Sequence, residues 1–450
     1  MNKKQIFTPT RRHWGGWIRT ALVLLVAATL GVRTAGAYSV LTHEQIIDLA
    51  WKDGIRPVLL SRYPNATPAQ LKEAHAYAYG GCVIQDEGYY PFGHQFFSDL
   101  THYVRTGAFV ANLIRDARNI DELAFALGAL SHYVSDGIGH HDAVNPSTAI
   151  EFPNLKAKYG PIVTYDQSPH GHVRTEFAFD IDQLSKRRIA PSAYWNYVGL
   201  KVPIRLLEQA FYETYGLKLG TMVLNQTAAV QTYRWAVRSF LPRIAYAEVV
   251  LHRKSFPADT PGTQFDLYQQ RLAQADFNNG WEHFRKKAGF RTYLVAGIIF
   301  ILPKIGPLSD LAIRGPKPQT EERYVESVNR TVTRYEQLLA ALAAHPKMSP
   351  WTAMNIDNLD LDTGMEAVPG TYRLMDNTYA KLLDRIVYVR QPIPERIKHD
   401  LLAYYANPKA PIATKKNKRA WQKVQRELTV LESMPVVPDR DPPPSLVYGD

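Results

Sequence analysis

The sequence has few of the residues that cross-link small folds or build thiolate metal sites. Its 450 residues contain one cysteine, Cys82, which excludes an intrachain disulfide and a cysteine-based zinc site. Alternating strand patterns are scarce, and helical apolar periodicity recurs instead. With 46% hydrophobic and 21% charged residues, the composition is globular and excludes wholesale disorder, collagen and coiled coil. We therefore predict an all-α fold, in which any metal must be held by histidines and carboxylates.

The sequence also lacks an apolar run long enough to cross a bilayer. Residues 21–30 form an apolar core behind a basic segment, and Ala35 and Ala37 supply the small residues of a signal-peptidase site. Ten residues cannot span the roughly 30 Å of hydrocarbon. We therefore predict that residues 1–37 are a signal peptide and that the mature chain, secreted or periplasmic, begins at Tyr38. The shorter apolar run at 294–302 is predicted to be a buried helix.

The excess of basic side chains belongs largely to this leader. The whole chain has a formal net charge of +11, but residues 1–37 contain six basic and no acidic side chains. The remainder has 47 basic and 42 acidic side chains, or +5. Charge alone therefore does not indicate a nucleic-acid-binding protein.

Helical patterns and Pro/Gly-marked breaks suggest the organisation of the mature chain. We predict a helical domain at 38–305, a second helical region of unknown role at 306–440 and a disordered tail at 441–450. Helices are predicted behind N-caps at Thr42 and Thr67, and from Asn119 to Val134.

One aspartate-rich segment, residues 355–363, invites comparison with a calcium-binding loop. It lacks the glycine and the terminal glutamate at the offsets that such a loop needs. We therefore predict a solvated loop without a metal.

The histidines are unevenly distributed, because nine of the 14 lie between His43 and His172. His132, Asp136 and His140 are spaced at i, i+4 and i+8, which places them on one face of a helix. Imidazole nitrogens and carboxylate oxygens are zinc ligands. His141 is an alternative to His140, whose helical phase fits better.

Further candidate ligands flank this helix. His172 and Glu176 form a second i, i+4 pair, and His43, Asp86 and His94 precede the helix. Several close cations can neutralise the charge that develops when a phosphate ester is cleaved. Asp136 has two oxygens and could bridge two metals. The remaining histidines of this region are predicted to be structural or exposed: His75, His102 and His170.

In this order the candidate ligands resemble those of the zinc-dependent phospholipase C family. Fungal single-strand nucleases share its all-α bundle and its site of three Zn²⁺ ions. The resemblance covers residues 38–180 and implies the following ligands: Tyr38, His43, Asp86, His94, His132, Asp136, His140, His172 and Glu176. It also implies a partition into three sites: Asp86, His94, His132 and Asp136; His140, His172 and Glu176; and Tyr38, His43 and Asp136.

The resemblance further implies an activity. A metal-bound hydroxide would attack phosphorus in line, with Asp86 as the catalytic residue that orients or deprotonates it, and signal cleavage would expose the ligating α-amine of Tyr38. The expected substrate is a phospholipid or other phosphodiester, with peripheral contact to a membrane surface. The ending of the last pair in Glu176 favours the lipase branch. The short step from Tyr38 to His43 favours a single-strand nuclease, and a zinc-binding protein without catalysis is a third alternative.

Overall fold

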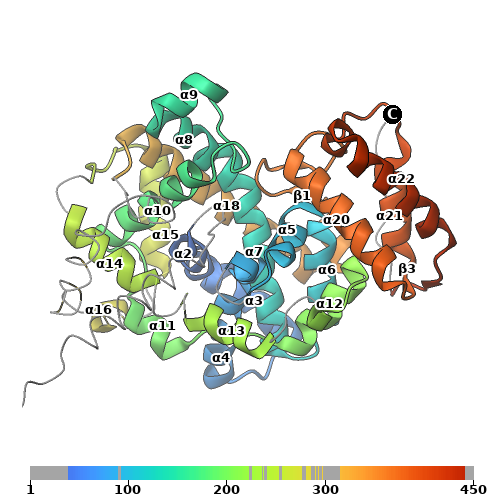
Figure 1. Ribbon diagram of the computed structural model, residues 1–450. Helices are drawn as coiled ribbons and strands as arrows, with labels where there is room; N and C mark the ends of the chain where they lie inside the picture. Colours follow the sequence, from blue (N-terminus) through green and yellow to red (C-terminus); the bar gives the residue numbers. More distant parts are fainter. Residues whose placement is uncertain are drawn as a thin grey trace, which may run out of the picture.

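A computed structural model confirms the all-α fold, with only four two-residue strands in the part that it describes (Figure 1). The structure describes residues 39–89, 93–221, 226–235, 237, 241–252, 256–275, 280–284, 289, 292, 296 and 315–440. Within these residues, no helix is both long and apolar enough to cross a membrane. Several predicted features lie outside them: the leader 1–37, Tyr38, the boundary at 305/306, nearly all of the run at 294–302 and the tail 441–450.

Most of the described helices before residue 221 follow one another with short connections. Those before residue 221 are α2 (Val40–Ala50), α3 (Arg56–Arg62), α4 (Pro68–Gly81), α5 (Gln95–Tyr103), α6 (Thr106–Asp116), α7 (Ile120–Gly139), α8 (Asn145–Glu151), α9 (Pro153–Tyr159), α10 (Pro169–Ser185), α11 (Ser192–Val198) and α12 (Ile204–Tyr215). Those that follow are α13 (Gln226–Trp235), α14 (Leu241–His252), α15 (Thr263–Ala275), α16 (Gly280–Phe284), α18 (Pro318–Ala344), α19 (Pro350–Met354), α20 (Arg373–Val389), α21 (Glu395–Ala406) and α22 (Lys418–Ser433). Short π and 3₁₀ segments are η1 (Trp51–Ile55), η2 (Ile84–Tyr89), η3 (His140–Val144), η4 (Leu219–Thr221) and η7 (Ala413–Lys416).

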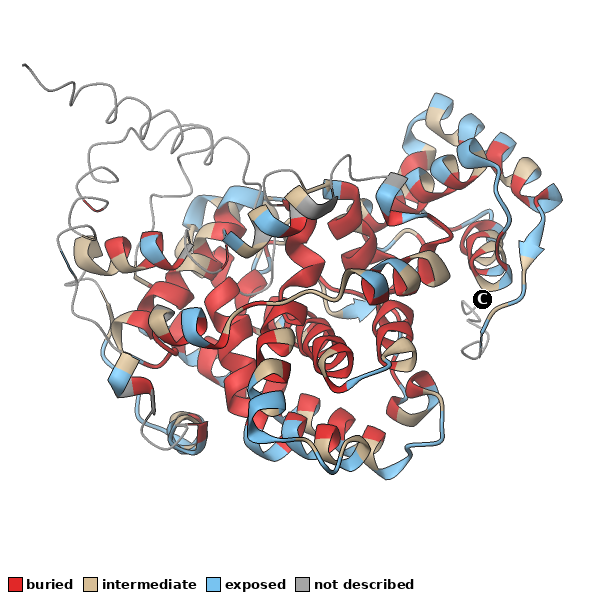
Figure 2. Ribbon diagram, turned by 90° about the horizontal axis from the view of Figure 1, so that it is seen from below, coloured by how far each residue is buried: buried red, intermediate tan, exposed pale blue. Residues whose placement is uncertain are grey.

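Helix α7 lies at the centre of the molecule (Figure 1) and is buried along most of its length. Figure 2 shows that buried residues gather on the inner helices. Helices α4 and α6 pack against it, and so does α18 from the C-terminal region. The Tyr335 hydroxyl of α18 donates a 2.7 Å hydrogen bond to the Leu127 carbonyl of α7. Described residues from both regions form one continuous hydrophobic core. The helix that carries the central histidines is therefore held from both parts of the chain.

The local start signals were mostly correct. Thr67 caps α4 in a complete capping box, and the Asn119 side chain accepts a hydrogen bond from a first-turn amide of α7. Helix α7 ends five residues later than predicted. The prediction that Thr42 caps the first helix was wrong, because α2 begins after Ser39. The free amides of its first turn instead bond to the Asp180 carboxylate of α10, a long-range cap that local sequence does not reveal.

The prediction of a solvated loop at 355–363 was also wrong in its second half. Residues 360–362 are buried. The first of them, Asp360, ends β1 (Leu359–Asp360), which pairs antiparallel with β2 (Met365–Glu366). A second two-stranded pair, which is parallel, joins β3 (Ile393–Pro394) to β4 (Val436–Val437). The first pair brings the C-terminal region against α5 and α6.

Close packing of α4 on α7 depends on glycines. A Cβ atom at Gly128 would overlap the carbonyl oxygen of Ala78, and one at Gly81 would overlap that of Phe125. Because neither backbone can move without disturbing both helices, Gly128→Ala is expected to lower the free energy of unfolding by about 1–3 kcal/mol. Urea denaturation measures this change. Gly262→Ala is the matched control, since no atom lies within 4 Å of its added methyl group, and equal stability of the two variants would contradict the packing argument.

Candidate metal centre

Eight buried side chains form three groups that could each hold a metal ion. In every group, one nitrogen or oxygen atom from each residue lies within 4.8 Å of the others. Among the described residues the groups are His43, His132 and Asp136; Asp86, His102 and His132; and His140, His172 and Glu176.

These side chains come from five parts of the fold. Asp86 lies on η2, His43 on α2 and His102 on α5, while His172 and Glu176 are one turn apart on α10. The remaining three residues follow the predicted i, i+4, i+8 spacing along α7 and the π-helical η3 that continues it. The central helix and its continuation thus supply candidate ligands to all three groups.

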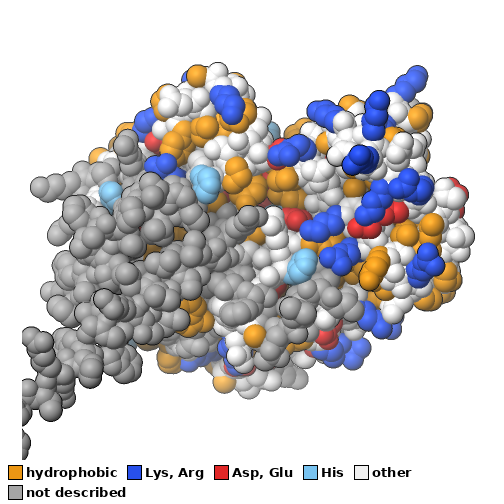
Figure 3. Space-filling view, viewed as in Figure 1, with side chains coloured by type: hydrophobic (Ala, Val, Ile, Leu, Met, Phe, Trp, Pro, Cys, Tyr) orange, Lys and Arg blue, Asp and Glu red, His pale blue; other side chains and the backbone are white. Residues whose placement is uncertain are grey.

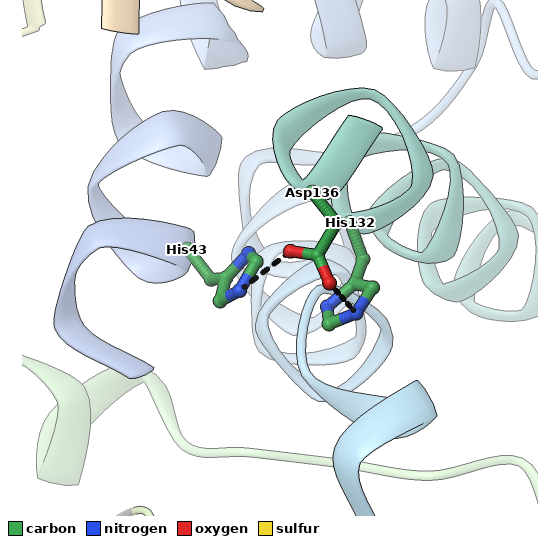
Figure 4. Close-up of side chains that lie close together, drawn as sticks. All are labelled: His43, His132 and Asp136. Carbon is green, nitrogen blue, oxygen red and sulfur yellow. Dashed lines mark ion pairs between the residues drawn. The ribbon is translucent and has the colours of Figure 1, made fainter. Parts of the chain in front are cut away.

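Asp136 lies between two of the groups. One of its oxygens, Oδ1, lies 3.4 Å from His43 Nε2. The other, Oδ2, lies 3.1 Å from His132 Nε2 and 3.3 Å from His102 Nε2. Figure 4 shows the carboxylate of α7 turned toward the two imidazoles that it labels. The two oxygens face different sets of nitrogens, which is the arrangement that a bridging carboxylate needs.

Hydrogen bonds outside the cluster determine which imidazole nitrogens face inward. His132 Nδ1 lies 2.9 Å from the Cys82 carbonyl, and His102 Nδ1 lies 2.8 Å from the Ser98 carbonyl. A carbonyl oxygen can only accept, so both Nδ1 atoms carry hydrogen and both neutral rings present a bare Nε2. These two Nε2 atoms lie 3.4 Å apart. Two facing lone pairs require a proton or a cation between them.

In the third group a carboxylate again lies close to two imidazoles. Glu176 Oε1 lies 2.8 Å from His172 Nδ1 and 3.6 Å from His140 Nε2. Burial raises the pKa of Glu176 well above its usual range. Burial alone would lower the pKa of His140, but the contact with Glu176 raises it to about 9. The pair therefore retains a proton that a bound cation would displace.

In the other groups the histidines differ in their protonation. Burial alone would lower the pKa of His102, but its contacts with Asp136 and Asp86 raise it well above the usual range. Burial and the neighbouring His132 lower the pKa of His43 to about 3. Burial alone would raise the pKa of Asp136, but the surrounding histidines hold it well below its usual range. Burial raises the pKa of Asp86. A bound cation would displace the proton of His102 and leave ionised Asp136 beside neutral rings, which is the donor set that binds zinc.

Unmatched polar atoms provide a test of whether these residues fit zinc. Within the described part of the chain, six ligand atoms of the cluster have no hydrogen bond: Asp86 Oδ1, Asp136 Oδ1 and Oδ2, His140 Nε2, His172 Nδ1 and Glu176 Oε1. Burying such atoms without a partner costs several kcal/mol in total. These atoms lie close to one another within the three groups, so a cluster of divalent cations could satisfy them together.

The structure assembles most of the predicted ligands but not all of them. His43, Asp86, His132, Asp136, His140, His172 and Glu176 lie in the three groups, and Tyr38 lies outside the described residues. His94 does not join them. It is half-buried before α5, where its Nδ1 accepts a 3.3 Å hydrogen bond from the Phe96 amide.

The residue that lies beside Asp86 instead is His102, which was predicted to be structural or exposed. Its Nε2 lies 3.4 Å from Asp86 Oδ1. His102 also satisfies the ligand order, because it falls between Asp86 and His132 and lies within a helix. His141, the alternative to His140, is exposed and pairs with Asp142. The other two histidines differ, since His75 is buried beside Asp48 and His170 is exposed.

Comparison with known proteins gives one match. Residues 42–220 match the sequence model of a family described as zinc dependent phospholipase C. This segment contains every described member of the three groups. Searches of curated proteins and of solved structures found no match.

Proposed function

We propose that this chain, whose residues 42–220 belong to the zinc-dependent phospholipase C family, is a phosphodiesterase that releases phospholipid headgroups. The observation that carries the proposal is the merging of buried metal-binding groups through Asp136. Mononuclear structural sites are closed by four ligands. A cluster with three adjacent groups suits a phosphate ester, whose cleavage spreads negative charge over several oxygens.

We assign the residues of the three groups to zinc ions as follows. His140, His172 and Glu176 would hold one zinc ion, and the other two groups would share Asp136 as a bridge. His132 presents only one bare nitrogen, so it would serve one of these two groups. The amine of Tyr38 is the proposed additional ligand after removal of the leader. Bound zinc supplies Lewis acidity and lowers the pKa of a water toward ~7.

Asp86 is the proposed catalytic residue. It is 5% exposed, the highest value among the eight described members of the groups, and burial raises its pKa. A carboxylate of raised pKa is a better acceptor for the proton of an attacking water. Its Oδ1 is held 3.4 Å from His102 Nε2, which orients the carboxylate toward the cluster.

The surface supports contact with phosphate-bearing lipid. Figure 3 shows Lys and Arg side chains gathered over the C-terminal helices. Lys381 of α20 lies 4.4 Å from the ring of Phe96. Burial lowers the pKa of His94, and the nearby Lys381 and Arg385 lower it further. Because α5 packs against both α20 and η2, which carries Asp86, we propose a peripheral membrane contact here, and secretion through the leader.

Substrate assays test the proposal. The mature protein is incubated with phosphatidylcholine vesicles, a nitrophenyl phosphocholine ester and single-stranded DNA, each with and without a zinc chelator. Headgroup release that the chelator abolishes and zinc restores is the expected result. Cleavage of DNA alone would replace the proposal with a nuclease, and zinc binding without turnover would indicate a non-catalytic protein.

A further inference from the structure

A loop from the C-terminal region lies directly behind the third metal-binding group. Residues 359–364 belong neither to the family match at 42–220 nor to any predicted ligand set. Leu361 and Asp362 are nevertheless buried. Two backbone carbonyls of this loop accept hydrogen bonds from side chains that lie 221 and 217 residues earlier in the chain.

The first carbonyl acts on His140. The Leu361 oxygen lies 2.6 Å from His140 Nδ1. Because a carbonyl only accepts hydrogen bonds, Nδ1 carries the hydrogen. When a cation displaces the other proton of this ring, the neutral imidazole presents a bare Nε2 on the side of Glu176, whose Oε1 lies 3.6 Å away.

The second carbonyl acts on His172 through Asn145. The Asn145 amide nitrogen donates a 2.7 Å hydrogen bond to the Asp362 oxygen. This bond turns the Asn145 oxygen toward His172 Nε2, which lies 3.0 Å away. Nε2 therefore carries the hydrogen, and the bare Nδ1 faces Glu176 at 2.8 Å. The loop thus selects opposite tautomers in two neighbouring histidines.

The loop is itself fixed from several sides. The Asp362 carboxylate accepts hydrogen bonds from the Tyr103 and Tyr372 hydroxyls, at 2.9 and 2.6 Å. The Leu361 amide donates to the carbonyl of His102, at 3.0 Å. Gly364 has a φ of +69°, and a Cβ there would overlap the Gly137 carbonyl of α7. The glycine allows the loop to lie directly on the helix that carries Asp136.

We infer that Leu361, Asp362 and Asn145 are positioning residues, through which the C-terminal region sets the tautomers of His140 and His172 and thereby the affinity of one zinc site. The inference rests on the proposed function. Outer hydrogen bonds of this kind commonly change metal affinity by about 10–100-fold. The C-terminal region would therefore be part of the metal centre and not an independent appendage.

Two measurements test it. In the zinc-loaded full chain labelled with ¹⁵N-histidine, long-range ¹H–¹⁵N spectra should show hydrogen on Nδ1 of His140 and on Nε2 of His172. The reverse assignment would overturn the inference without any variant. In a competitive chelator titration, Asn145→Ala should lower the affinity for one zinc ion by about 10–100-fold and leave the affinities for the others unchanged.

Asn112→Ala is the matched control, because Asn112 is also buried but bonds to Thr214, away from the histidines. If Asn145→Ala does not fold, Tyr372→Phe is the second variant, because it removes one hydrogen bond to the Asp362 carboxylate. It should lower the affinity for the same zinc ion to a smaller extent. Unchanged affinity for all ions in a folded variant refutes the inference. A wild-type chain that binds no zinc refutes the proposed function instead, before any variant is compared.

Discussion

Asp136→Asn is expected to remove bound zinc and catalytic activity together. The carboxylate presents one oxygen to His43 and the other to His102 and His132. Asparagine keeps the shape but replaces one oxygen with a hydrogen-bond donor, which cannot ligate a cation. Loss of an outer-sphere partner already costs about 10–100-fold, so loss of the bridge should reduce activity by more than about 100-fold. Zinc content and turnover are measured on the same sample.

Asp142→Asn is the matched control for this variant. Asp142 lies two residues after His140 but near the surface, where it pairs with His141 and Arg330. The control should retain zinc and activity. Circular dichroism should show that both variants are folded, because the amide introduced by Asp136→Asn can still donate to a bare imidazole. Normal zinc content in a folded Asp136→Asn protein would contradict the bridging role.

His102→Ala and His94→Ala are expected to have opposite effects. His102 Nε2 lies within 3.4 Å of both Asp86 and Asp136, so its removal should deplete zinc and lower activity by more than about 100-fold, again exceeding an outer-sphere loss. His94 only caps α5. Its removal should cost about 1 kcal/mol of stability and leave the zinc content unchanged.

Metal analysis and thermal unfolding of both histidine variants distinguish the two assignments. Each variant serves as the control for the other, since both remove one imidazole from the same short stretch of chain. Retention of full zinc by His102→Ala, combined with depletion in His94→Ala, would restore the ligand set inferred from sequence order.

Sequence predicted the parts of the site that local periodicity determines. Helical phase placed His132, Asp136 and His140 on one face and favoured His140 over His141, and the structure puts His140 in the cluster and His141 at the surface. The i, i+4 spacing of His172 and Glu176 likewise predicted that these two side chains share a helix face, and they lie in one group. These relations need only the geometry of a single helix.

Where two histidines fit the same ligand order, helical periodicity could not predict which of them reaches the cluster, because that depends on tertiary contacts. His94 and His102 satisfy the same order between Asp86 and His132, and only the packing of α5 decides which of them reaches the cluster. The buried loop at 360–362 shows the same limit. Its composition predicted solvated aspartates, but Asp362 is satisfied by tyrosine hydroxyls from positions 103 and 372. Such partners can be distant in sequence and carry no local signal.

The most direct test of the account is the zinc content of the purified mature chain, measured by elemental mass spectrometry with the protein concentration determined independently. The account predicts three zinc ions per chain, removed by chelation and restored on addition of zinc. A chain that contains no zinc, or that binds at most one ion when zinc is supplied, would contradict the multinuclear centre on which the proposed hydrolase depends.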